Sequence, residues 1–298
     1  MTDTNKKRLA TGALFLATII WGISFVIMKN SLDYINPSYL VAIRFLFAAI
    51  IMSLIFIRRW KYCTLKLALT GIWTGTFLGL AYIIQTYGLK YTTPGKNAFL
   101  TSIYCIMVPF LMWVFTKKKP DKYNVIAVIL TVIGIGFVSL NFTNGESIFG
   151  IGDILTIICS IFYGLHIVVV NVYAQKYDIY LITIFQFIIS SAIAWIWSLI
   201  YEGTPQPITL NMLPQLLYLI IFSSAIALML QNYGIKNANP NQGALILSLE
   251  SVFGALASLI FGFETNLSLI KIMGFVIVFT AIVISETKLS FLRKKKTE

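Results

Sequence analysis

Two nearly identical strings decide the fold of this chain: QTYGLKYTTP at Gln85–Pro94 and QNYGIKNANP at Gln231–Pro240. They lie 146 residues apart, and the likeness extends beyond them, since Ser102 and Ser248 keep the same offset. Chance is a poor explanation for a match of this length. The chain therefore reads as two related halves, and the remaining question is what kind of structure is repeated.

The composition answers part of that question. Of the 298 residues, 58% are hydrophobic and only 11% are charged, and the mean hydropathy is +0.84. A typical soluble domain carries about 25% charged residues. A soluble fold could not bury so much apolar sequence and still present a polar surface. The composition therefore indicates an integral membrane protein.

The apolar sequence is divided into runs long enough to cross a bilayer, which requires about 20 residues per helix. Because the runs are continuously apolar rather than alternating, they favour helices over the strands of a barrel. The predicted spans are residues 9–30, 37–57, 67–89, 95–116, 123–141, 149–172, 179–201, 212–235, 241–263 and 269–287. We therefore expect an all-α integral membrane protein with ten transmembrane helices.

The positive charges predict the orientation of these spans. Lys6, Lys7 and Arg8 precede the first run as in a signal peptide, but that run is too long and lacks a cleavage pattern, so we expect it to remain. With the N-terminus inside, 18 of the 23 Lys and Arg residues lie on the inner side and four on the outer. Both termini should be cytoplasmic in a multi-pass protein of the cell (plasma or inner) membrane. The net charge of +12 is thus explained by lipid-facing loops, and no nucleic acid is expected as a partner.

The repeat acquires a mechanical meaning in this arrangement. Five spans separate the two strings, and an odd number reverses the direction of the chain across the membrane. We therefore expect two inverted-topology five-helix repeats, residues 1–141 and 142–298. Halves related in this way can exchange conformations and open a central site to each side in turn, whereas the alternative is a duplicated but static bundle.

At this point the chain resembles the EamA (RhaT-like) family of the drug/metabolite transporter superfamily. The resemblance covers nearly the whole chain and rests on IIWGISFVIMK, INPSYLVAIRFLFAA, GLKYTTPGKNAFLTSIYCIMVPFLMWVF and LILSLESVFGALASLIFGFE, in that order. Two positions depart from the family pattern: Lys118 stands where the second half has Glu264, and Ser251 rather than Pro follows Glu250. The resemblance implies a secondary carrier, commonly an exporter of amino acids or other small metabolites. It also implies a cavity between the halves, with the fifth and tenth helices at the periphery.

Ionisable side chains inside spans cost about 2.5 to 3.5 kcal/mol on insertion scales, so the three that occur are candidate site residues. Arg44 either binds a substrate carboxylate or supports the cavity wall, unless it only snorkels toward the surface. Glu250 lies at a similar depth, so the two could pair in an empty cavity and separate to hold an amino acid. Glu250 could alternatively carry a coupling proton or be a packing residue. His166 is the only histidine and a second candidate for proton coupling, although a lone His more often makes one structural hydrogen bond.

Polar and aromatic positions complete the predicted substrate cavity. They are Trp21, Tyr82, Gln85, Asn97, Tyr104, Tyr163 and Gln231. Asn97 and Tyr104 share a helical face, and Tyr104 occupies the repeat position equivalent to Glu250. For most of these residues, an ordinary packing role is an equal alternative.

Enzyme chemistry finds little support in the sequence. There is no H-E-x-x-H or G-x-S-x-G motif, one His cannot form a multi-His metal site, and the three Cys are scattered. We expect no enzyme activity, no cofactor and no metal. The expected function is secondary active transport of a small molecule, with proton coupling as one option and a channel as the alternative function. The protein should be a monomer or homodimer in the lipid bilayer.

Overall fold

A computed structural model describes residues 3–117, 119–139, 150–237, 240–264 and 269–289. Within these ranges the chain is all-helical, with no strand. Seven helical segments are long and apolar enough to cross a membrane: Asn5–Ser31, Pro37–Ile55, Leu65–Lys90, Pro94–Phe115, Ile151–Ala174, Ile179–Glu202 and Leu210–Asn237. Three further apolar helices are shorter, at Lys122–Ile135, Ile246–Ile260 and Ile272–Ser285.

All ten predicted ranges contain helix. The α-helices are α1 (Asp3–Ser31), α2 (Pro37–Ile55), α3 (Leu65–Lys90), α4 (Pro94–Thr101), α5 (Tyr104–Thr116), α6 (Lys122–Ser139), α7 (Ile151–Ala174), α8 (Ile179–Trp197), α9 (Leu213–Leu217), α10 (Ala227–Asn237), α11 (Pro240–Ile260) and α12 (Leu269–Thr287). The 3₁₀-helices are η1 (Ile57–Tyr62) and η3 (Leu210–Met212), and the π-helices are η2 (Ser198–Glu202) and η4 (Tyr218–Ile226). The predicted boundary between residues 141 and 142 lies outside the described residues.

Local sequence explains where several helices begin. Pro37 and Pro94 occupy the first turns of α2 and α4, where the missing N–H of proline costs nothing. The Thr93 hydroxyl accepts a hydrogen bond from the Lys96 N–H, and the Asp178 carboxylate caps α8 by accepting from the N–H groups of Tyr180 and Leu181. Polar caps thus mark the membrane-surface ends of apolar helices.

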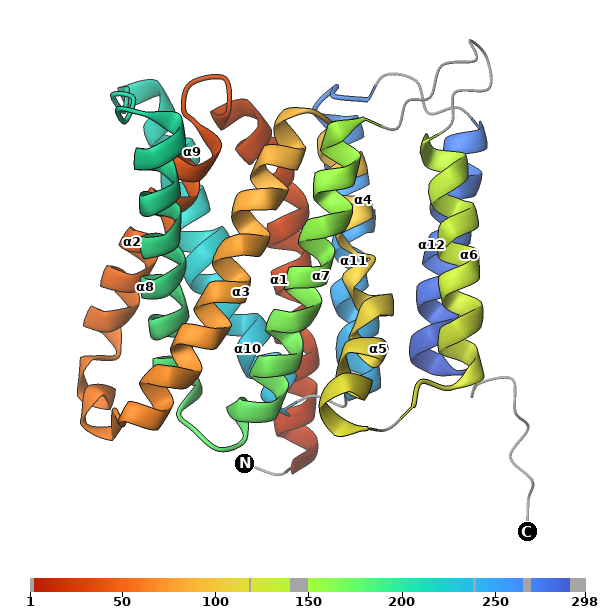
Figure 1. Ribbon diagram of the computed structural model, residues 1–298, viewed down its shortest axis with the longest axis horizontal. Helices are drawn as coiled ribbons and strands as arrows, with labels where there is room; N and C mark the ends of the chain where they lie inside the picture. Colours follow the sequence, from red (N-terminus) through yellow and green to blue (C-terminus); the bar gives the residue numbers. More distant parts are fainter. Residues whose placement is uncertain (1–2, 118, 140–149, 238–239, 265–268, 290–298) are drawn as a thin grey trace.

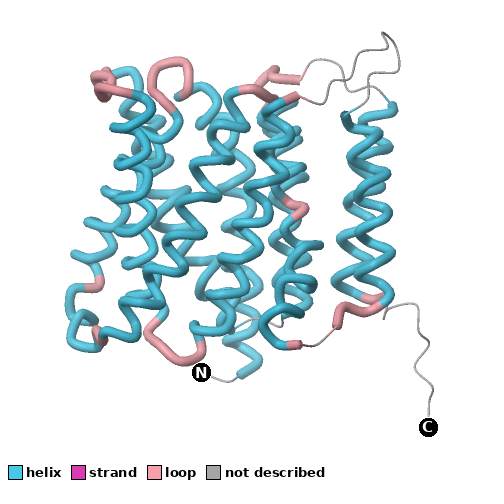
Figure 2. Tube along the Cα trace, viewed as in Figure 1, coloured by secondary structure: helices cyan, strands magenta, loops and turns pink. Residues whose placement is uncertain are grey.

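Three predicted spans are not regular α-helices throughout. The fourth is interrupted between α4 and α5, partway along the bundle, where Figure 2 shows a short loop. At this break the Ser102 hydroxyl donates to the carbonyl of Phe99, a bond that competes with the regular helical ladder. The seventh ends in a π-helical segment, η2, and the eighth contains another, η4, before α10 begins. All three stretches are nevertheless long and apolar enough to cross a membrane.

The helices pack as a bundle with a pair at its side (Figure 1). Helix α3 packs between α7 and α8, α1 packs against α10 and α11, and α2 packs against α8 and η4. Helices α6 and α12 pack chiefly against each other and stand beside the rest. We call the end where α1 begins and α12 ends the lower end, and the end where α2, α4 and α7 begin the upper end, as oriented in Figure 1.

Candidate functional site

A cavity lies inside the bundle where α1, α2, α3, α4, α5, α7, η4, α10 and α11 meet. About 450 Å³ of space lies between the atoms of its wall, a figure that includes space open to solvent. Eight of the ten predicted site residues line it: Trp21, Arg44, Tyr82, Gln85, Tyr104, Tyr163, Gln231 and Glu250. Most of the predicted site residues therefore meet at one cavity inside the bundle.

Arg44 provides the positive charge of the cavity. Its side chain is fully buried, with 0% of its surface exposed. Its Nε donates to the hydroxyl of Ser224 at 2.8 Å, and its Nη2 donates to the hydroxyl of Ser223 at 2.7 Å. The guanidinium carbon also lies 4.8 Å from the ring centroid of Tyr82. Hydroxyls and an aromatic face hold the group in place, but neither neutralises its charge.

The two serines were not predicted as site residues. Ser223 and Ser224 lie on η4, the π-helical part of the eighth span, and the Ser223 carbonyl also accepts a hydrogen bond from Trp21 Nε1 at 3.0 Å. Short π-helical segments occur frequently at functional sites. The sequence signal for them was a pair of adjacent hydroxyl residues in an apolar run. In a regular α-helix, however, neighbouring side chains point in different directions, so the sequence did not predict that both would contact Arg44.

Glu250 places a carboxyl group in the cavity from α11, and 7% of its surface is exposed. Within the part of the chain that the structure describes, this carboxyl has no hydrogen-bond partner and no ion-pair partner. Arg44 and Glu250 do not pair directly in this structure, where the serine hydroxyls hold the guanidinium. The same cavity therefore contains a guanidinium and a carboxyl group, each without an ionic partner among the described residues.

Tyrosines and amides form the wall around these charges. The rings of Tyr82 and Tyr163 meet edge to face, with centroids 5.4 Å apart. The Tyr163 hydroxyl donates to Gln85 Oε1 at 2.7 Å, and Gln85 Nε2 donates to the Thr101 hydroxyl at 2.9 Å. Gln231 Oε1 is buried without a hydrogen-bond partner in the described structure. The wall thus combines aromatic faces with an amide oxygen that remains available to a ligand.

Asn97 and His166 do not line this cavity. Asn97 Nδ2 donates to the Thr156 hydroxyl at 2.7 Å and thereby joins α4 to α7. His166 Nε2 lies 3.1 Å from Gln186 Oε1 on α8. Both side chains are fully buried away from the cavity wall, and their hydrogen bonds connect neighbouring helices.

Metal chemistry has no obvious place at this site. Among the described residues, no three His, Cys, Asp or Glu side chains are grouped closely enough to hold a metal ion. The polar groups of the cavity are instead one guanidinium, one carboxyl, amides and hydroxyls, which suit reversible binding of a small polar molecule.

These features define a multi-pass membrane protein with a cavity inside its helix bundle. The chain matches the EamA-like transporter family twice, over residues 9–140 and 150–287. It therefore belongs to this family and is a membrane transporter.

Similar proteins agree with this assignment. An "Uncharacterized transporter" of Archaeoglobus fulgidus is 32% identical over 257 residues, which cover 85% of this chain and 78% of the relative. The "Uncharacterized transporter YrdR" of Bacillus subtilis is 25% identical over 98% of both chains. A solved crystal structure with 15% sequence identity covers 97% of this chain and 99% of its own, with a TM-score of 0.70, and supports the fold alone.

Proposed function

We propose that this protein is a secondary active carrier that exports an amino acid or a similar small dipolar metabolite by alternating access of the central cavity. The observation that carries this proposal is the presence of Arg44 and Glu250 in one cavity without ionic partners among the described residues. Burying an uncompensated charge is costly, so such a pair is best explained by a ligand with complementary charges. A carboxylate would bind Arg44, and an ammonium would approach Glu250.

We further propose that the chain crosses the membrane ten times as two inverted repeats, residues 1–141 and 142–298. The twofold family match supports this division. The packing also supports it. In the two proposed repeats α1 is equivalent to α7, α3 to α10 and α4 to α11. The contacts of α1 with α10 and α11 therefore have their equivalents in the contacts of α7 with α3 and α4. In addition, α6 packs on α12 and α2 packs on α8, so each of these helices contacts its own counterpart. Phe45 of α2 stacks on Phe187 of α8 with ring centroids 5.6 Å apart.

The proposed orientation places the lower end in the cytoplasm of a plasma or inner membrane. Most Lys and Arg residues of the sequence fall in the loops and termini of that end. Among the described residues, the upper-end basic side chains include Lys29 and Lys96, and both are bonded within the protein. The proposed functional unit is a monomer. The alternative is a homodimer in which two copies pair through the side formed by α6 and α12.

Glu250 is the proposed carrier of a coupling proton, because its carboxyl faces the cavity and no partner in the described chain fixes its protonation state. His166 remains a second proposed proton site, acting from outside the cavity wall through its contact with Gln186. Proton release and substrate binding at the same carboxyl would couple the two fluxes.

Uptake into proteoliposomes tests the proposal. A pooled, isotope-labelled set of amino acids and small metabolites is supplied with and without an inward proton gradient, and saturable accumulation of one class is expected. The Glu250→Gln variant should lose the effect of the gradient but keep substrate exchange. The Arg44→Gln variant should no longer prefer a substrate over its carboxamide analogue. Ion conductance without saturable uptake would instead identify a channel.

A further inference from the structure

The upper end of the bundle carries three carboxylates that follow residue 142 in the sequence and contact helices that precede it. The first is Glu202, at the end of η2. Its Oε1 accepts from the N–H of Ser38 at 2.8 Å, and its Oε2 accepts from the N–H of Tyr39 at 3.1 Å. Both N–H groups belong to the first turn of α2, where an anion is favoured by the helix dipole.

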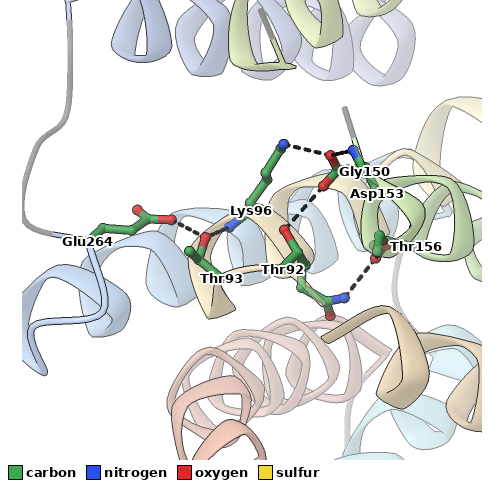
Figure 3. Close-up of polar contacts among 9 residues, drawn as sticks. Thr92, Thr93, Lys96, Gly150, Asp153, Thr156 and Glu264 are labelled. Carbon is green, nitrogen blue, oxygen red and sulfur yellow. Dashed lines mark hydrogen bonds and ion pairs between the residues drawn. The ribbon is translucent and has the colours of Figure 1, made fainter. Parts of the chain in front are cut away.

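The second carboxylate, Glu264, contacts the first turn of α4 (Figure 3). Its Oε1 accepts from the hydroxyl of Thr93, the N-cap residue, at 2.5 Å. The carboxylate also lies directly over Gly95, since a Cβ added at that glycine would be 2.9 Å from both carboxylate oxygens. The absence of a side chain at Gly95 leaves room for this carboxylate, so the start of α4 fits an acidic group from the other half of the chain.

The third carboxylate, Asp153, joins α7 to α4. Its Oδ2 lies 2.6 Å from Lys96 Nζ, and its Oδ1 accepts from the Thr92 hydroxyl at 3.1 Å (Figure 3). The side chains are almost completely buried, with 11% of Lys96 and 2% of Asp153 exposed. Beside them Gly88 and Gly152 meet backbone to backbone, because a Cβ on Gly152 would lie 2.7 Å from the Gly88 carbonyl oxygen.

We propose that Asp153, Glu202 and Glu264, with their partners, form an upper latch that holds the cavity closed toward the upper end and opens during transport. This inference rests on the proposed alternating access. Each bond joins a helix or linker of residues 1–141 to a residue of 142–298, so it must break if the upper ends of α2 and α4 separate from the segments that carry Asp153, Glu202 and Glu264. The Gln85–Thr101 and Asn97–Thr156 bonds tie α3, α4 and α7 together at neighbouring positions, and Gln85 and Thr101 also line the cavity.

A ligand site is a weaker interpretation of the same groups. The pocket at this end also contains Lys29, but Lys29 Nζ already donates to the carbonyls of Leu89, Lys90 and Thr92. Asp153 is likewise occupied by Lys96, Thr92 and the Gly150 N–H. Glu264 Oε2 is an exception, because it is buried without a hydrogen-bond partner among the described residues. Lys29 and Asp153, whose charged groups are satisfied by the protein itself, fit a structural closure better than a binding site.

The native thiol of Cys159 reports on this closure. Cys159 is buried on α7, and its Sγ lies 3.9 Å from the hydroxyl of Thr101, which lines the cavity. With Cys63 and Cys105 replaced by Ser, the rate at which a hydrophilic maleimide alkylates the purified protein measures access to this position. Breaking a buried ion pair shifts such an equilibrium strongly, so we expect Asp153→Asn and Lys96→Met to accelerate alkylation about tenfold or more.

Matched controls make the test specific. Lys90→Met removes an exposed positive charge at the same end, and Arg59→Met removes one at the lower end; neither should accelerate alkylation. The charge swap Lys96→Asp with Asp153→Lys should return the rate toward that of the parent and shows that the variants fold. Unchanged alkylation in Asp153→Asn, or equal acceleration in the controls, would overturn the latch. Because alkylation needs no substrate, this result is independent of whether the proposed transport function is correct.

Discussion

The upper and lower ends of this bundle are closed by different chemistry, although related sequence strings, identical at five of ten positions, occur at the two ends. Gly88 of QTYGLKYTTP lies at the upper end, against the backbone of Gly152 and the hydroxyl of Thr156. Gly234 of QNYGIKNANP lies at the lower end, against the side chain of Leu14. A repeated scaffold therefore does not require repeated contacts.

The ion pairs of the two ends differ in the same way. At the upper end, Lys96 and Asp153 are buried together. At the lower end, Arg59 pairs with Asp178 at 2.7 Å, but 42% of the Arg59 side chain is exposed. Desolvated bonds are either made or broken, whereas hydrated ones exchange readily with water. We therefore predict that the contacts of the lower end open gradually, whereas the upper end is either closed or open.

The largest expected effect comes from breaking the buried pair. Lys96→Met leaves the Asp153 carboxylate buried without its ammonium and should cost about 3 kcal/mol of unfolding free energy, whereas Arg59→Met should cost less than about 1 kcal/mol. Denaturant titration in detergent micelles measures both values. Equal losses in the two variants would mean that burial does not distinguish the two ends.

The two glycines test the comparison at the level of packing. Gly152→Ala introduces a Cβ against backbone atoms of Gly88 and Tyr91, which cannot yield without moving α3, and should cost about 2 kcal/mol. Gly234→Ala meets only the side chain of Leu14, and alanine favours helix by about 1 kcal/mol, so its net change should lie within about 1 kcal/mol of zero. The same titration measures both, and a Gly234→Ala loss as large as that of Gly152→Ala would contradict the distinction.

Much of the cavity could be predicted from the sequence because polar groups in apolar spans are costly and rarely accidental. Arg44, Glu250 and His166 stand out by this criterion, and the structure brings Arg44 and Glu250, but not His166, to one cavity. The helical period did not predict the environment of His166. Tyr163 and Ile167 on the same helix line the cavity, but His166 does not. A period fixes the faces of one helix, but the neighbour that each face meets, here Gln186 of α8, depends on tertiary packing.

The closure of the upper end was not predicted, for a related reason. Asp153, Glu202 and Glu264 lie near helix ends, where acidic residues usually contact water. Their partners belong to helix starts more than 50 residues away in the sequence, such as Ser38 for Glu202. The sequence predicts where helices begin and end, but the pairing of those ends follows from the packing of the whole bundle. The Ser223–Ser224 contact with Arg44 was missed because a π-helical segment departs from the regular period.

The smallest effect belongs to the Asp121–Lys288 ion pair at the lower end, where the two side chains are 34% and 49% exposed. Burial alone would raise the pKa of the Asp121 carboxyl, but hydrogen bonds from Lys288 and the Asn124 N–H outweigh it, so the pKa lies below its usual range. A pKa that is lower in the folded state stabilises the protein above the unfolded-state pKa, and this contribution is lost as the pH falls through the folded-state value.

Asp121→Asn should therefore cost less than about 1 kcal/mol near neutral pH, and its difference from the parent should vanish as the pH falls below the folded-state pKa. Denaturant titration across that pH range, with Lys288→Met and the double variant, isolates the pair. Because this pair lies beside α6 and α12, away from the cavity and the upper latch, transport by Asp121→Asn should match that of the parent. A loss comparable to that of Lys96→Met would show that exposure at the lower end is a poor guide to the strength of its contacts, and the contrast between the two ends would no longer hold.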